Sequence, residues 1–357
     1  MSDNLQLSPL RKVLLDPASS VDLTALEWDV LLCMTDKSRL TASLGNRLER
    51  QGMTGELPEE VKTRFLAAQI YSRYRSRLIR WEMNRLQRAL RGTNYEVVAL
   101  KGGAYLLLNL PFAESRLAAD LDILVPASDI SEFERLLQEQ GWEPEELSEY
   151  DQRYYREWMH EIPPLRHRER KVEVDVHHAL LPLTAKLKPN SDLLFESARP
   201  IEGSRFKVLC WKDMILHAVV HLFYDSDLDG RIRDLVDLDE LFRRFCGSDR
   251  DAWAQLMERS KIQGLQRPLF YALRYCKQIV ATPIPNDIQF DDKPSRLAIV
   301  IMDRLVPRAI FPDLPGKKNR INSIARWLLY VRSHYLRMPL RLLIPHLLYK
   351  SIKGQSH

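Results

Sequence analysis

The sequence predicts an α+β protein in which a small mixed sheet lies between helical regions. Apolar residues recur with a helical period up to residue 92 and again from residue 211, whereas short runs between these stretches alternate apolar and polar residues. A chain of 357 residues, 45% of them apolar, is long enough for two or three domains with buried cores. We therefore expect an N-terminal helical region at 1–92, a core at 93–210, a helical domain at 211–292 and a basic amphipathic helical tail at 293–357.

Local signals place the elements within these regions. Pro58 suits the first turn of a long helix, and Gly92 suits its end. Gly102 and Gly103 indicate a turn after a strand, and a capped helix that stops at Gly141 follows the next strand. The expected core elements are a strand at 95–100, a short helix at 104–109, a strand at 121–125, a strand with a loop within 150–170, and strands at 171–177 and 205–209. Helices are expected next, at 215–223, 232–245, 253–257 and 265–279.

Three aspartates stand out in two of the expected strands. Asp120 and Asp122 lie in the run 119–125, and Asp175 lies in the run 172–178. Both runs alternate apolar and acidic residues, so their carboxylates emerge on one face if the two strands are neighbours. We expect no cation beside this cluster, and such a cluster is costly unless it holds a metal ion.

The order of motifs in the core resembles a known family. A strand is followed by Lys101-Gly102-Gly103, an arginine precedes Asp120-Leu121-Asp122, and a third carboxylate lies in Val174-Asp175-Val176-His177. This order is similar to the bacterial nucleotidyltransferase family within the DNA polymerase beta superfamily, over about residues 90 to 245. The resemblance implies a polymerase beta-type nucleotidyltransferase core. The loop between the glycines and Asp120 is longer than is usual in that superfamily.

The resemblance also implies a reaction and a site. The protein is expected to be an enzyme that needs Mg²⁺ (or Mn²⁺) and transfers a nucleoside monophosphate from a nucleoside triphosphate to an unknown acceptor. Asp120, Asp122 and Asp175 would be the metal ligands and catalytic residues, because Mg²⁺ prefers carboxylate oxygens and two ions can stabilise the attacking and leaving oxygens. The residues expected to contact the nucleotide phosphates are Lys101, Gly102, Gly103 and Arg116.

Histidines near these motifs are further candidates. His177 shares the strand face of Asp175 by parity, so it is a candidate for orienting the substrate or the acceptor. His217 and His221 lie one helical turn apart, and we favour core histidines over a zinc pair because no Glu follows His217. The acceptor is left open among a small molecule, a saccharide, a protein and a tRNA. The alternative to an enzyme is a non-catalytic or regulatory module of the same fold that acts through its helical flanks on a partner or membrane surface.

Charge and composition bear on location. The tail from residue 293 carries 13 Lys or Arg against two Asp, within a chain of net charge +5. It is expected either to pack on the helical domain or to make a peripheral membrane contact, with basic side chains toward anionic lipid. There is no apolar run of 18 residues, no signal-peptide pattern and no CxxC cysteine pair, so a cytoplasmic location is expected.

Overall fold

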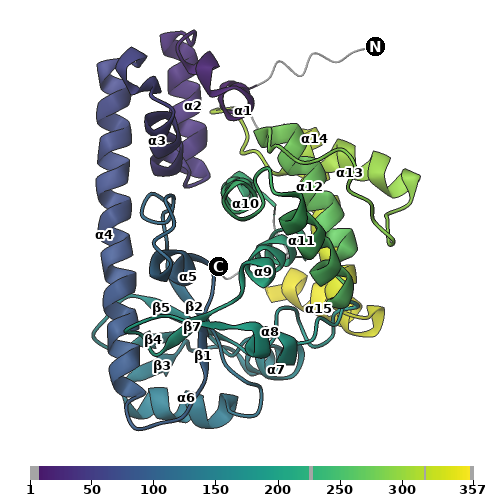
Figure 1. Cartoon of the computed structure of the whole chain (residues 1–357). Helices are drawn as coiled ribbons and strands as arrows, with labels where there is room; N and C mark the ends of the chain where they lie inside the picture. Colours follow the sequence, from purple (N-terminus) through teal and green to yellow (C-terminus); the bar gives the residue numbers. More distant parts are fainter. Residues whose placement is uncertain (1–7, 225–227, 317–318, 354–357) are drawn as a thin grey trace.

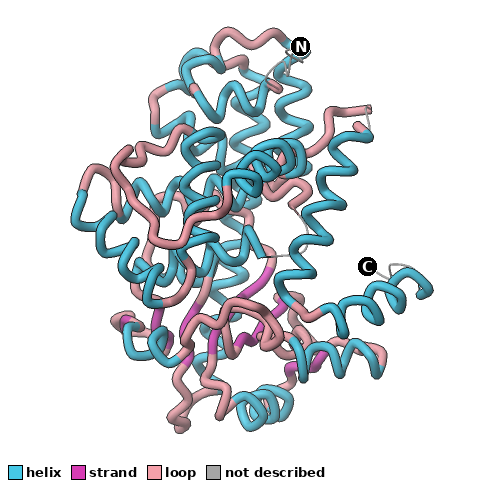
Figure 2. The backbone as a smooth tube through the Cα atoms, turned by 90° about the vertical axis from the view of Figure 1, so that its right-hand side faces the viewer, coloured by secondary structure: helices cyan, strands magenta, loops and turns pink. Residues whose placement is uncertain are grey.

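The computed structural model describes residues 8–224, 228–316 and 319–353. In this part of the chain, 15 α-helices accompany one seven-stranded mixed sheet, which confirms the predicted α+β class. Figure 1 shows the sheet at one end of the molecule, with the N-terminal helices and most of the C-terminal helices stacked beyond it, whereas the last helix, in yellow, is level with the sheet in this view. The tube in Figure 2 shows the same division, because the strands gather at one end and helices fill the rest.

The N-terminal region is helical, as predicted, in the part that is described. Its long helix runs along one side of the molecule from the N-terminal helices to the sheet (Figure 1), beginning directly after Pro58. Glu82 on this helix is fully buried and accepts hydrogen bonds from Trp142 Nε1 at 2.8 Å and Arg170 Nε at 2.7 Å. These bonds fix the helix to one edge of the sheet. The helices of this region are α1 (Pro9–Leu15), α2 (Ala25–Lys37), α3 (Thr41–Arg50) and α4 (Glu59–Ala89), with 3-10 turns η1 (Pro17–Ser20) and η2 (Met53–Glu56).

The sheet has its two acidic strands side by side. Its strands are β1 (Val97–Ala99), β2 (Asp120–Leu124), β3 (Trp142–Pro144), β4 (Leu165–His167), β5 (Glu173–His177), β6 (Arg199–Pro200) and β7 (Phe206–Val208), in the spatial order β3-β4-β5-β2-β1-β7-β6. Strands β2 and β5 pair in parallel, and β1 pairs antiparallel with β2 and parallel with β7. The neighbouring strands that the acidic runs required are therefore present.

The helices of the core differ in places from the prediction. They are α5 (Lys101–Leu107), α6 (Ile130–Glu139), α7 (Glu149–Trp158) and α8 (Asp192–Ser197). The strand-plus-loop expected within 150–170 is wrong for its first half, where α7 forms because the Ser148 hydroxyl accepts a bond from the Asp151 amide at its first turn. The short helix expected at 104–109 begins earlier, so Gly102 and Gly103 belong to its first turn.

The C-terminal half is helical throughout the described residues. Its helices are α9 (Trp211–Tyr224), α10 (Ile232–Phe245), α11 (Arg250–Ile262), α12 (Gln266–Val280), α13 (Arg296–Ala309), α14 (Arg320–Arg337) and α15 (Leu340–Lys353). Within that part of the chain, no helix is both long enough and apolar enough to cross a bilayer.

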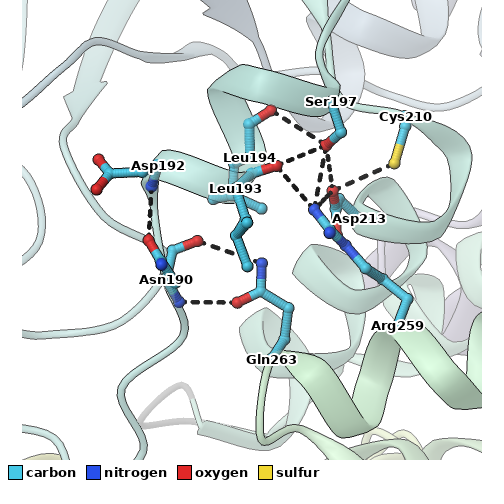
Figure 3. Close-up of polar contacts among 9 residues, drawn as sticks. All are labelled: Asn190, Asp192, Leu193, Leu194, Ser197, Cys210, Asp213, Arg259 and Gln263. Atoms are coloured by element: carbon cyan, nitrogen blue, oxygen red, sulfur yellow. Dashed lines mark hydrogen bonds and ion pairs between the residues drawn. The ribbon is translucent and has the colours of Figure 1, made fainter.

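A buried polar network joins the sheet domain to these helices (Figure 3). Asp213 at the start of α9 is fully buried and accepts bonds from Arg259 Nε and Nη2 at 2.7 and 2.6 Å. Ser197 at the end of α8 donates to the same carboxylate at 2.8 Å. One aspartate therefore fixes α8, α9 and α11 together, and a buried carboxylate is tolerated there because its charge is paired and hydrogen-bonded.

The tail has one packed face and one exposed face. On α14, Ala325 and Leu329 are buried, whereas Ile324 and Trp327 remain 57% and 62% exposed. The packed face agrees with the expectation that the tail packs on the helical domain. The basic positions 317–318 and the side chain of Lys350, which belong to the expected lipid-facing charge, lie outside the described residues.

Candidate active site

The three aspartates lie on one wall of a single cavity. In the β2–β5 register, Asp122 lies opposite Asp175, and Asp120 lies two pairs further along, opposite Glu173. Because side chains alternate along a strand, residues 120 and 122 share a face, and Asp175 lies beside them on that face. All three border a cavity of about 230 Å³.

The cavity is built from segments that are far apart in the sequence. The two acidic strands form one wall, and the rest of the lining comes from the start of α5, from the loops at 159–161 and 180–182, from helix α9 and from the end of helix α14. Besides the aspartates, the lining residues are Lys101, Met159, His160, Glu161, His177, Leu180, Leu181, Pro182, His217, Val220, His221, Tyr224 and Arg337.

A lysine lies directly against the carboxylates. Lys101 follows β1 with a positive φ of 40°, and its Nζ atom lies 2.6 Å from Asp122 Oδ1. The expectation of a cluster without a local cation is therefore wrong. The sequence could not show this contact, because Lys101 and Asp122 meet only through the antiparallel pairing of β1 with β2.

The three carboxyl groups differ in electrostatics. Burial would raise the pKa of Asp122, but Lys101 and the His177 hydrogen bond outweigh it and hold that pKa well below its usual value. Burial and then the Asp122 charge raise the pKa of Asp120. Burial, Asp122 and Glu161 raise the pKa of Asp175 well above its usual value. Lys101 thus compensates one carboxylate, and a further cation would stabilise the ionised forms of the other two.

His177 lies where parity on β5 placed it. Its side chain is 3% exposed, and its Nε2 atom lies 3.1 Å from Asp122 Oδ1. Its ring centroid is 5.2 Å from that of His160 and 6.5 Å from that of His217. His217 faces this cavity from α9, and burial, followed by the nearby Lys101 charge, lowers its pKa well below the usual value.

The two glycines and the arginine have structural contacts. A Cβ added to Gly102 would lie 2.9 Å from Arg116 Nη1, and one added to Gly103 would lie 2.9 Å from Leu121 Cδ1. Both glycines therefore let α5 pack closely on the loop and strand beside it. Arg116 is only 7% exposed, and its Nε atom lies 2.5 Å from Asp237 Oδ2 on α10. Contacts of these residues with a nucleotide remain predictions.

The long loop before Asp120 is held by arginines from two helices. Arg75 on α4 donates to the carbonyl oxygens of residues 118 and 119 at 3.2 and 2.7 Å. Arg233 on α10 donates to the carbonyl of residue 117 at 3.1 Å. Together with the Arg116–Asp237 pair, these bonds fix the position at which β2 begins, and so the position of Asp120.

The sequence pattern gave no signal for Arg337, at the end of α14. Its side chain is 7% exposed and borders the cavity, and its Nη2 atom lies 3.2 Å from His334 Nε2. Among the described residues, its Nε atom has no hydrogen-bond partner and no carboxylate forms an ion pair with it. Its backbone is fixed, since Thr184 Oγ1 donates to the Arg337 carbonyl at 2.7 Å and Lys186 N donates to the Leu336 carbonyl at 2.9 Å.

A comparison of sequences identifies the class of protein as a nucleotidyltransferase family. A sequence model of the family described as "Uncharacterised nucleotidyltransferase" matches residues 24–281. Because this match covers more than half of the chain, the protein belongs to that family, and the predicted resemblance is confirmed at this level. No curated protein and no solved structure matched the chain.

Proposed function

We propose that this protein is a divalent-metal-dependent nucleotidyltransferase that moves a nucleoside monophosphate from a nucleoside triphosphate to an acceptor hydroxyl or phosphate. Membership of the family supports nucleotidyl transfer in general. The proposal of a divalent metal and a nucleoside triphosphate rests on one observation. Asp122 pairs with Asp175 across β2 and β5, and Asp120 lies on the same cavity wall.

The carboxylates suit Mg²⁺ or Mn²⁺. Both ions accept carboxylate oxygens, and Mg²⁺ keeps several waters, so three aspartates are enough protein ligands. The raised pKa of Asp175, caused by burial and by the neighbouring carboxylates, marks a position where a bound cation would relieve repulsion. When bound, the metal would supply charge stabilisation at the attacking and leaving oxygens.

The proposed step conserves atoms and charge. An acceptor oxygen forms a bond to the α-phosphorus, the bond from that phosphorus to the bridging oxygen of the β-phosphate breaks, and pyrophosphate leaves. The acceptor proton passes to the Asp175 carboxylate, which lies at the cavity wall. Lys101 holds Asp122 ionised and in place, and His177 donates to the same oxygen.

Arg337 is proposed to bind an anionic group of the substrate. Its guanidinium is buried at the cavity, and within the described residues no carboxylate forms an ion pair with it. A buried cation of this kind is stabilised when a phosphate enters, because arginine forms charge-assisted hydrogen bonds with phosphate oxygens. The acceptor remains open among a small molecule, a saccharide, a protein and a tRNA.

We also propose a cytoplasmic location and leave a peripheral contact of the tail as the alternative. The four cysteines are free, as expected for a reducing compartment. The exposed Ile321, Ile324 and Trp327 on α14 are the observation that favours a surface contact. A non-catalytic module acting through this face would bind its partner or membrane without releasing pyrophosphate.

Labelled nucleotide tests the proposed function. Full-length protein incubated with α-labelled nucleoside triphosphate, Mg²⁺ and a cell lysate should yield a labelled acceptor and release pyrophosphate. Asp120→Asn and Asp122→Asn should abolish both products while circular dichroism shows an intact fold. The matched control is Glu139→Gln, which removes an exposed carboxylate on α6 and should leave turnover unchanged. Unchanged turnover in both aspartate variants would reject the assignment.

A further inference from the structure

A second group of potential ligands lies beside the three aspartates. His160, Glu161 and His177 each offer one ligand atom, and these atoms all lie within 4.8 Å of one another. His177 belongs to β5, whereas His160 and Glu161 lie in the segment between α7 and β4. The group borders the same cavity but contains none of the three aspartates.

The backbone holds these residues in a fixed arrangement. Glu161 forms an antiparallel bridge with His177, and the amide of Ile162 donates to the carbonyl of Val176 at 3.1 Å. The amide of His178 donates to the carbonyl of His160 at 2.8 Å. An isolated bridge and two backbone hydrogen bonds therefore hold segment 160–162 against the end of β5, which fixes the positions of its side chains.

The spacing of two of the ligand atoms fits a single ion. His177 Nδ1 lies 3.3 Å from Glu161 Oε2. Two ligands bound about 2.1 Å from one ion at a tetrahedral angle lie about 3.4 Å apart. The observed separation is close to that value.

The two ring nitrogens of His177 lie beside different carboxylates. Nε2 contacts Asp122, and Nδ1 lies beside Glu161. Asp122 Oδ1 already accepts the Lys101 ammonium at 2.6 Å, so it is an ionised acceptor, and His177 Nε2 at 3.1 Å must be the donor. In the neutral ring, Nδ1 then carries a lone pair. That atom is buried and has no hydrogen-bond partner among the described residues, yet it lies close to Glu161. A lone pair opposite a carboxylate is unfavourable unless a proton or a metal ion lies between them.

We propose that His160, Glu161 and His177 bind one divalent first-row transition ion, with Asp122 orienting His177 from outside the ligand shell. A carboxylate that accepts the second N–H of a ligating histidine is the usual support of such sites. Two imidazoles and one carboxylate favour transition ions over Mg²⁺, which prefers an all-oxygen shell. Binding at this site needs no nucleotide and does not depend on the proposed transfer reaction.

Cobalt is the probe for this site, because Co²⁺ bound to imidazole and carboxylate absorbs visible light. Metal-free full-length protein titrated with Co²⁺ should develop these bands with one ion per chain. His160→Ala and Glu161→Gln should each weaken the binding about tenfold or more. The matched control is His178→Ala, which removes the neighbouring imidazole but keeps the backbone bond to His160. This control should bind Co²⁺ as the unchanged protein does.

Further variants separate the metal site from the stability of the fold and from the proposed transfer reaction. His160→Gln preserves most of the side-chain volume and replaces His160→Ala if that variant melts early. Co²⁺ binding that is unchanged in the His160 and Glu161 variants, absent altogether, or displaced by equimolar Mg²⁺ would overturn the transition-metal site. Asp120→Asn should retain the Co²⁺ bands. If the unchanged protein binds Co²⁺ at this site but transfers no nucleotide, the proposed function fails and the metal site stands.

Discussion

The Nε atom of Arg116 lies 2.5 Å from Oδ2 of Asp237, and both residues are at most 7% exposed. This pair ties the loop before β2 to helix α10 across more than a hundred residues of sequence. The pair therefore joins the sheet that carries the three aspartates to the helical domain. In this structure the positive charge of Arg116 is paired with the carboxylate of Asp237.

Breaking this pair should destabilise the protein. Arg116→Met and Asp237→Leu should each lower the free energy of unfolding by about 3–5 kcal/mol, because each leaves one buried charge unpaired. The double variant should lose less than the sum of the two, since it leaves no isolated charge. Urea denaturation followed by circular dichroism measures all three. Strictly additive losses would show that the two side chains are not coupled.

Removing Arg337 should weaken substrate binding more than it weakens the fold. Arg337→Gln should raise the KM for the nucleoside triphosphate, or for an anionic acceptor, about tenfold, because one charge-assisted hydrogen bond is lost. The control is Arg341→Gln, which removes an exposed arginine of α15. Steady-state kinetics and a melting curve of each variant make the comparison. Equal KM values in the two variants would contradict a role for Arg337 in binding.

Gly103 should not tolerate a side chain. Its added Cβ would lie 2.9 Å from Leu121 Cδ1, and Leu121 is fully buried in β2, so Gly103→Ala should lower stability by about 1–3 kcal/mol through overpacking. At Gly55, a Cβ would meet nothing within 4 Å, so Gly55→Ala serves as the control. Chemical denaturation of both variants measures the two free energies of unfolding. A Gly103→Ala protein as stable as the control would mean that β2 can shift freely.

His217 should make stability depend on pH. Burial and then the Lys101 charge lower its pKa, so the folded protein keeps the ring neutral where the unfolded chain binds a proton. Its contribution is therefore complete above about pH 6.5, the ordinary histidine value, and declines as the pH falls below it. Urea midpoints measured in chelator from about pH 7.5 to 5 should fall less steeply in His217→Gln. Parallel curves for the two proteins would contradict the prediction.

The sequence predicted what depends on local pattern. Alternation along the strands was enough to place Asp120, Asp122 and Asp175 on one face once β2 and β5 paired, and Pro58 marked the start of α4. The contact of Lys101 with Asp122 depends on an uncommon backbone conformation and on strand pairing, neither of which leaves a periodic signal. The position of Glu161 beside His177 also leaves no periodic signal in the sequence. Arg337 leaves none either, because it reaches the cavity from more than 150 residues beyond the last of the aspartates.

The contribution of α14 to the cavity has a practical consequence for how the chain is divided. A fragment cut to residues 24–281, where the family match ends, would retain every acidic side chain of the site. It would lack Arg337 and the two bonds by which residues 184 and 186 are fastened to the end of α14. Such a truncation would remove the α14 side of the cavity and expose the cavity to bulk water there. An assay of the shortened protein would therefore report on a different pocket from that of the full-length chain.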